Sequence, residues 1–231
     1  MAFHNGTNLV RNGLTFAIDV LSENCYPGSG TTVTDLMGSR SGTLTNGPTI
    51  GTSPTKHINF SGGNDDILIY SNYIPTELTT NSYSLEFWFT NNAGSAHEGV
   101  FVMANNAFQI YARNSKLEIF QSSVGTTNYD IANSAKNSTS LGSDGDWNCA
   151  VLHRSGTTIT FFINGVADGQ VTSVSSNVGT GSHPLETKIG AYGSNTYPYG
   201  GLIGPVRIYN RALTVAEINQ NFNQQRGRFG I

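Results

Sequence analysis

Residues 83–90 read Tyr-Ser-Leu-Glu-Phe-Trp-Phe-Thr, and this stretch decides the fold class. Counting from Tyr83, every second side chain is large and apolar, whereas Ser84 and Glu86 fall between them. Successive side chains of a β-strand point to opposite faces, so this period of two predicts a strand with one face in a hydrophobic core. Residues 159–163 and 206–208 repeat the alternation.

Short strand-like stretches recur along the chain and are separated by turn-forming residues. Besides 83–90, we expect strands at residues 14–19, 57–60, 67–70, 99–103, 108–113, 116–121, 147–154, 157–164, 186–189 and 202–209. Many short strands joined by turns are typical of an all-β sandwich or barrel. Asn164-Gly165 predicts a tight type I′ hairpin, because both residue types tolerate a positive φ. Residues 26–56 and 122–146 are polar and rich in Gly, Ser and Thr, so we expect long loops there.

One helix is expected near the end of the chain, at about residues 214–226. Thr214 and Glu217 have the spacing of a capping box, in which each side chain satisfies a free backbone N–H of the first turn. Gly227 is suited to ending the helix. The remaining tail, residues 227–231, is too short to predict an element of its own.

Composition excludes several classes of protein. The 231 residues carry a net charge of −3, and only 12% of them are charged, so binding driven by phosphate neutralisation, and with it a nucleic-acid partner, is not expected. No apolar run approaches the roughly 18 residues of a membrane span. The first six residues lack the features of a signal peptide, so secretory export is not expected. Cys25 and Cys149 are then expected to be free thiols.

The sequence does not predict an enzyme. Motifs for a serine nucleophile or a phosphate-binding loop are absent from the sequence, and its five histidines lack the spacing of a local metal pair. Hydrolysis of a sugar needs two carboxylates, but Glu86 has no second carboxylate on its strand face, where Trp88 is its neighbour. We therefore expect no catalytic residues and no required cofactor.

Aromatic side chains in a polar setting are the candidate glycan-binding residues. Tyr192, Tyr197 and Tyr199 share a loop with Asn195, and Trp88 is the further candidate. Flat rings beside amides suit the faces of sugars. They suit protein contacts equally well, and loop tyrosines can also simply pack on the rim of the fold. These alternatives stay open at the level of the sequence.

Five stretches in order carry a resemblance to a known family: residues 60–69, 83–89, 147–151, 161–165 and 201–214. They resemble the laminin-G-like, or concanavalin A-like lectin, domain of the pentraxin-related kind. The resemblance covers nearly the whole chain. It implies a single domain over residues 1–231, built as two antiparallel sheets in a jelly-roll sandwich with one short C-terminal helix.

The same resemblance implies at most a weak calcium site. In pentraxin-like members an acidic and amide pair before an apolar strand ligates calcium, and Asn64 and Asp65 stand at the matching place. The loop that would supply further ligands, residues 190–195, lacks a carboxylate, and Gly204-Pro205 replaces the usual acidic residue. Backbone carbonyls and water would have to complete the coordination.

A narrower likeness concerns residues 24–32, 42–49 and 221–231, which are similar to stretches in laminin-G-like virion proteins of tailed bacteriophages, especially cyanophages. It implies a structural virion protein on the phage surface, first of all a capsid decoration protein. Such a protein assembles in the host cytoplasm, contacts other capsid or tail subunits and is expected to form a homo-oligomer. The alternative is a carbohydrate-binding adhesin, or a fibre or tail component, that recognises host-surface glycans.

The end of the chain is the candidate assembly contact. Arg226, Arg228 and Phe229 belong to residue types that are enriched at protein interfaces. We expect them to meet a neighbouring subunit, and we expect deletion of residues 227–231 to leave stability almost unchanged. The alternative is a frayed terminus with solvated arginines.

Overall fold

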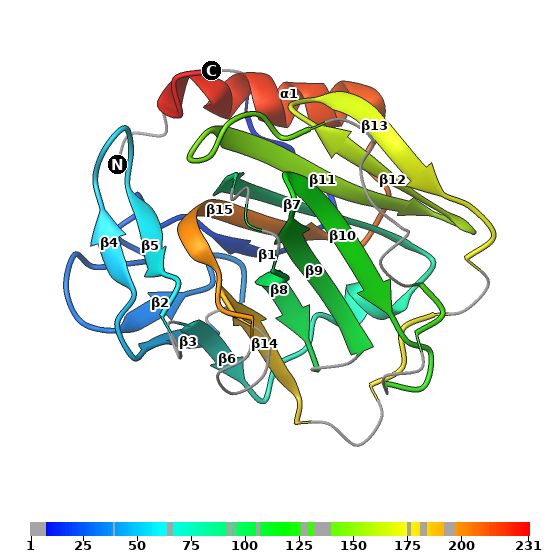
Figure 1. Ribbon diagram of the computed structural model, residues 1–231, viewed down its shortest axis with the longest axis horizontal. Coiled ribbons are helices and arrows are strands. Elements are labelled where there is room, and N and C mark those ends of the chain that lie inside the picture. Colours follow the sequence, from blue (N-terminus) through cyan, green and yellow to red (C-terminus); the bar gives the residue numbers. More distant parts are fainter. Residues whose placement is uncertain are drawn as a thin grey trace.

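The computed structural model shows two antiparallel β-sheets packed face to face, with one helix outside them (Figure 1). The prediction of an all-β sandwich with a short C-terminal helix is therefore confirmed. The structure describes residues 8–38, 40–63, 67–91, 94, 96–104, 107–125, 129–131, 140–174, 177–180, 184–191 and 197–231.

The first sheet has eight strands in the order β13-β12-β11-β7-β15-β5-β4, and β1 pairs with the far part of β15. Strand β7 lies at its centre, between β11 and β15, and is the strand predicted from the alternation at 83–90. The strands are β1 (Leu14–Ile18), β4 (Thr49–Gly51), β5 (His57–Ser61), β7 (Ser82–Thr90), β11 (Trp147–Ser155), β12 (Thr158–Ile163), β13 (Val166–Val171) and β15 (Gly200–Tyr209).

The second sheet has seven strands in the order β10-β9-β8-β14-β6-β3-β2. Three of them form a meander in which each strand pairs with the next along the chain, from β8 to β10. The strands are β2 (Thr32–Thr34), β3 (Ser41–Thr45), β6 (Ile67–Ser71), β8 (Glu98–Met103), β9 (Phe108–Arg113), β10 (Lys116–Gln121) and β14 (Glu186–Ile189).

The core lies between the sheets and receives one face of each. From β7 it takes Leu85 and Phe87, and from the opposite sheet it takes Phe101 and Ile110, all of them buried in one cluster. The hairpin between β12 and β13 has the predicted form, because Asn164 and its glycine neighbour both have a positive φ, of 52° and 83°. The predicted loop at 26–56 is wrong, because β2, β3 and β4 run through it.

Helix α1 (Val215–Gln225) covers the outer face of the first sheet, and Figure 1 shows it beside β11, β12 and β13. Ile218 packs in a buried cluster with Val151 and Phe162 from the strands beneath it. The capping box is present as predicted, with Thr214 accepting from the backbone N–H of Glu217 and the Glu217 side chain accepting in return. The helix thus seals a sheet face that the alternation alone would leave exposed.

A buried ion pair lies under this helix. The Glu86 carboxylate is 2.6 Å from the Arg207 guanidinium, and Asn221 of the helix donates to the other carboxylate oxygen at 2.7 Å. All three side chains are buried. Glu86, the carboxylate weighed for sugar hydrolysis, is therefore part of the packing between helix and sheet, where no sugar reaches it.

The end of the chain is docked on the molecule itself, and it is not the frayed terminus that was the alternative interpretation of the sequence. Phe229 is 3% exposed and stacks on Trp88, with ring centroids 4.1 Å apart. Arg228 forms an ion pair with Asp19 at 2.7 Å, within a 3-10 turn over Arg226–Arg228. Phe229 is therefore a core residue and not an assembly contact, and its burial gives reason to expect that deleting the tail lowers stability. Arg226 is exposed, and its role in assembly stays a prediction.

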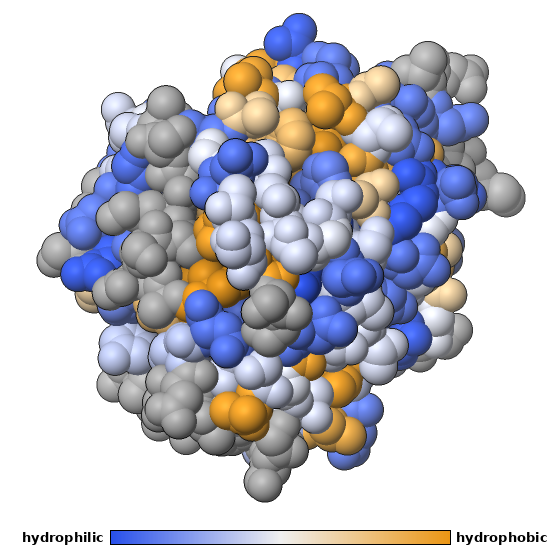
Figure 2. All heavy atoms as spheres, turned by 90° about the vertical axis from the view of Figure 1, so that its right-hand side faces the viewer, coloured by the Kyte–Doolittle hydropathy of each residue, from blue (hydrophilic) through white to orange (hydrophobic). Residues whose placement is uncertain are grey.

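Both cysteines are free and buried, as predicted. Burial raises the pKa of Cys25 to about 12 and holds the pKa of Cys149 well above its ordinary value, so both thiols stay protonated at neutral pH. Among the helices of the described residues, none is long and apolar enough to cross a membrane. Figure 2 shows small groups of apolar residues separated by hydrophilic ones, which is ordinary for a water-exposed surface.

Candidate functional site

The outer face of the second sheet carries an aromatic and charged cluster where β9 and β10 run side by side. The alternate residues Ile110 and Ile119 enter the core, so their neighbours point the other way. Tyr111 stands opposite Glu118 in the register, and its ring centroid is 5.3 Å from that of Phe120 in edge-to-face contact. Because these side chains face away from the core between the sheets, their contacts can shape a site on the outside of the sheet.

His97, just before β8, joins this cluster from above. Its ring meets those of Tyr111, Phe120 and Tyr197 edge to face, with centroids 5.2, 5.6 and 5.7 Å away. Its Nε2 lies 3.2 Å from a Glu118 carboxylate oxygen. One imidazole therefore connects the sheet to the loop that contains Tyr197.

A hollow of about 540 Å³ opens beside this cluster, and we call it the tyrosine hollow. Tyr197 is 46% exposed there, although aromatic rings are usually mostly buried. The hollow is lined by Ser61, Gly62, Ala96, His97, Glu98, Tyr197, Pro198 and Gly200. It combines an exposed ring, a carboxylate, an imidazole and backbone groups, which is the mixture that fixes a small polar ligand.

Backbone contacts hold the walls of the tyrosine hollow in place. Gly200 pairs with Ser61 across β15 and β5, and the Gly200 N–H donates to the Glu98 carboxylate at 3.0 Å. The carbonyl of Tyr197 accepts from the N–H of Gly99 at 2.9 Å. The exposed ring is thus carried by a segment that is tied to both sheets, which lowers the entropy lost when a ligand binds.

His97 is neutral at pH 7 in this setting. Burial, followed by the positive charge of Arg113, lowers the pKa of His97 below its ordinary value of 6.5, and the carboxylate of Glu118 only partly opposes this. A neutral imidazole has one N–H donor and one acceptor nitrogen. Because Nε2 faces the Glu118 carboxylate, Nδ1 is the nitrogen left to accept from a ligand hydroxyl, and it adds no positive charge to the hollow.

Of the five candidate glycan-binding residues, the structure places Tyr197 at the hollow. Trp88 and Tyr199 are 0% exposed, so their assignment to a sugar-contacting surface is wrong. Trp88 lies beneath Phe229, and the Tyr199 hydroxyl donates to the carbonyl of Thr90 inside the sandwich. Tyr192 and Asn195 lie outside the described residues.

The expected calcium residues, Asn64 and Asp65, also lie outside the described residues. They follow Ser61 and Gly62 of the tyrosine hollow in the sequence. Within the part of the chain that is described, no group of three or more His, Cys, Asp and Glu side chains is arranged to hold a metal. The weak calcium site stays a prediction.

The sequence reading missed most of the cluster at the hollow. His97 and Glu98 precede a strand without any motif, and Tyr111 and Glu118 sit in strands that were recognised for their core-facing side only. The available signal was the other half of the alternation. Strands 108–113 and 116–121 both carry charged and aromatic residues on the face turned away from the core.

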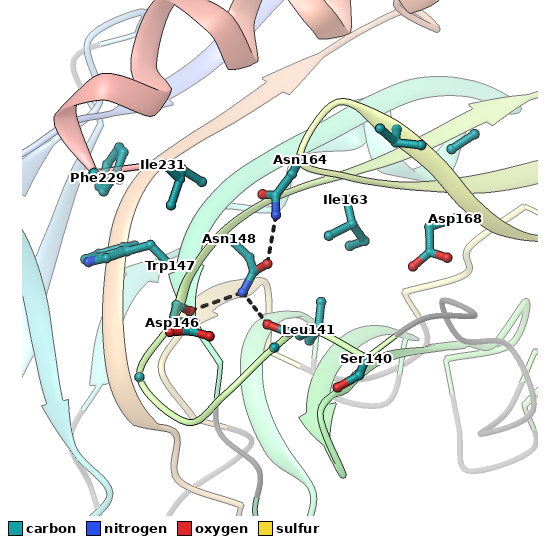
Figure 3. A pocket seen from close by; sticks show the side chains of 15 residues that line it. Ser140, Leu141, Asp146, Trp147, Asn148, Ile163, Asn164, Asp168, Phe229 and Ile231 are labelled. Atoms are coloured by element: carbon teal, nitrogen blue, oxygen red, sulfur yellow. Dashed lines mark hydrogen bonds between the residues drawn. The ribbon is translucent and has the colours of Figure 1, made fainter.

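A second, larger hollow of about 800 Å³ lies where the C-terminus meets the β12–β13 hairpin and the loop before β11 (Figure 3). Its polar side chains are directed at one another. Asn148 donates to the carbonyls of Leu141 and Asp146 and accepts from Asn164, and Asn164 accepts from the N–H of Cys149. These amides hold the walls together, so this C-terminal hollow suits a ligand less well than the tyrosine hollow does.

Comparison with known proteins identifies the fold family. Residues 61–219 match the family model of the concanavalin A-like lectin/glucanases superfamily, and no curated protein sequence matches the chain. Among solved structures, the binding domain of botulinum neurotoxin serotype D is similar, with a TM-score of 0.67 and 16% identity over 92% of this chain. The chain spans about half, 52%, of that structure.

Two further structures share the fold. Domain 4 of AbnA, an extracellular arabinanase from Geobacillus stearothermophilus solved with arabinotriose, has a TM-score of 0.65 and 16% identity, covering 90% of this chain and 97% of that one. Trypanosoma rangeli sialidase in complex with sialic acid has a TM-score of 0.63 and 13% identity, covering 96% of this chain and 35% of the sialidase. At these identities the likeness shows the fold alone.

Proposed function

The chain belongs to the concanavalin A-like lectin/glucanases superfamily, and from that premise we propose that it is a carbohydrate-binding module. Its sugar-contacting surface is the tyrosine hollow. The observation that carries this proposal is the Tyr197 ring, 46% exposed beside the Glu98 carboxylate and the neutral His97. An exposed ring packs against the apolar face of a sugar while polar groups take its hydroxyls. The volume, about 540 Å³, falls within the roughly 300–1,000 Å³ of ligand sites.

The module binds without hydrolysis in this proposal, and it requires no cofactor. The carboxylate weighed for catalysis, Glu86, is 0% exposed and engaged with Arg207. The complex of the arabinanase domain with arabinotriose supports a binding role for a domain of this size, because this chain covers 97% of that one. Calcium is retained only as a weak ligand to be tested.

A glycan array, probed with and without calcium, tests the proposal. We expect binding that Tyr197→Ala weakens about tenfold or more, because an aromatic anchor supplies more than about 1.4 kcal/mol at such a contact. The matched control is Val166→Ala, which trims an exposed side chain at the C-terminal hollow and leaves affinity unchanged. Absence of binding in both conditions would remove the function. Binding that is unchanged in the tyrosine variant would move the site elsewhere.

We place this module on the surface of a tailed-phage particle, as a capsid decoration protein or, alternatively, as a fibre or tail component. The support is the likeness of residues 24–32, 42–49 and 221–231 to virion proteins. Other capsid or tail subunits and further copies of the chain are its proposed partners. Mass spectrometry of purified particles tests this placement, and a copy number of only a few per particle would contradict decoration of a capsid lattice.

A further inference from the structure

Among the described residues that line the tyrosine hollow, Glu98 is the one with a charged side chain at neutral pH. The Glu98 carboxylate is fixed at its edge by the hydrogen bond from the Gly200 N–H, 3.0 Å long. His97 is neutral at pH 7 for the reasons given above, and the remaining lining residues carry no ionised group. A ligand in the hollow therefore lies next to the Glu98 carboxylate.

The charges behind the hollow do not reverse this sign. Arg113 lies 3.9 Å from the carboxylate of Glu118 on the outer face of the sheet, so these two charges offset each other. The same guanidinium lies 3.4 Å from His97 Nε2.

We propose that the tyrosine hollow takes neutral sugars and discriminates against carboxylated ones such as sialic and uronic acids. This inference rests on the proposed function and names its substrate class. A sugar carboxylate in the hollow would lie next to Glu98, and like charges repel strongly where protein displaces water. A fixed charge of the wrong sign is a common way in which a site rejects a competing ligand.

The test compares neutral glycans with their sialylated counterparts, for example N-acetyllactosamine with sialyl-N-acetyllactosamine, at low salt. We expect sialylation to weaken binding about tenfold or more, which corresponds to about 1.4 kcal/mol. Glu98→Gln keeps an oxygen that can accept from the Gly200 N–H but removes the charge. It should bring the ratio of the affinities for the neutral and the sialylated glycan to within about threefold. Glu23→Gln, on an exposed loop, removes the same charge elsewhere and should leave the ratio unchanged.

Salt gives a second measurement that does not depend on a variant. Raising ionic strength from about 0.01 M to 1 M shortens the screening length from roughly 30 Å to 3 Å, so discrimination by charge should shrink. Equal or tighter binding of the sialylated member overturns the inference while the proposed function survives. An unchanged ratio in Glu98→Gln also overturns it. If neither member of any pair binds, the proposed function fails, and this inference fails with it.

Discussion

Phe229 shows how a single residue near the chain end can close a sheet face. Its ring lies against both tryptophans, 4.1 Å from Trp88 and 4.6 Å from Trp147 between centroids. The strand beneath provides the space at Gly204, where an added Cβ would lie 3.0 Å from the Phe229 ring and 3.0 Å from the Cβ of Trp88. A larger residue at this position would therefore require the Phe229 ring or Trp88 to shift by a few tenths of an ångström.

We predict that Phe229→Ala lowers the free energy of unfolding by about 3–5 kcal/mol, the usual cost of emptying a buried aromatic position. Urea unfolding followed by tryptophan fluorescence measures the loss. Ile231→Ala, which trims a side chain 41% exposed in the same tail, is the control and should change stability by less than about 0.5 kcal/mol. Equal effects of the two substitutions would show that the tail is not docked in solution.

Individual residues of strand β7 show what the sequence could predict and what it could not. The alternation at 83–90 predicted which residues of this strand enter the core, because that depends on local periodicity alone. It could not identify what covers the other face. Glu86 finds its partner Arg207 at a distance of 121 residues along the chain, and Trp88 finds Phe229 farther still. Such pairs follow from topology, which a local pattern does not contain.

Among the elements, helix α1 has an N-terminus that the sequence predicts clearly, through its capping box. Glu217 accepts at the capping box and also forms an ion pair with Arg211 at 2.6 Å. The hydrogen bond from Arg211, more than any other contact, lowers the pKa of Glu217 from its ordinary value of 4.5 to about 2. A carboxylate whose pKa is depressed by folding stabilises the folded state at pH values above its unfolded pKa. This contribution is lost as the pH falls from 4.5 toward 2.

We predict that Glu217→Gln destabilises the protein by about 1 kcal/mol at pH 6, the scale of a lost cap, and by much less near pH 2. Urea midpoints measured across this range give the difference between variant and parent. Glu23→Gln removes a carboxylate from an exposed loop and serves as the reference for a general effect of charge. A difference that does not vary with pH would mean that the ionised form of Glu217 contributes nothing to the cap.

Four strands were missed in the sequence, and three of them, β2, β4 and β13, lie at sheet edges. Strands β2 and β4 have three residues each, and β2 buries only Val33 completely, so no period of two can be recognised there. Strand β13 contains Gly169 at a φ of 98° near an irregular register, and its sequence is turn-like. Short, irregular edge strands are a usual protection against pairing with other chains. The property that protects them also hides them from a periodicity analysis.

At the scale of the whole molecule, the closed sheet face and the tyrosine hollow are formed by different residues. The first sheet is closed by helix α1 and the tail, with Trp88 and the Glu86–Arg207 pair buried beneath them. The tyrosine hollow instead lies where the start of β8 meets the end of β5 and the start of β15, with the exposed Tyr197 ring in contact with His97. None of the residues that line the tyrosine hollow belongs to the buried cluster of Trp88, Trp147, Cys149 and Phe229, so stability and the proposed binding depend on different residues.

This separation predicts that stability and binding can be changed independently. Phe229→Ala should leave glycan affinity unchanged at a temperature where the variant is still folded. Tyr197→Ala should change the free energy of unfolding by no more than about 1 kcal/mol, because the residue is 46% exposed. In the double variant, the changes in the free energy of unfolding caused by the two substitutions should add to within about 0.5 kcal/mol, as they do for distant sites. A larger coupling, or a loss of affinity in folded Phe229→Ala, would mean that the tail and the hollow communicate through the core.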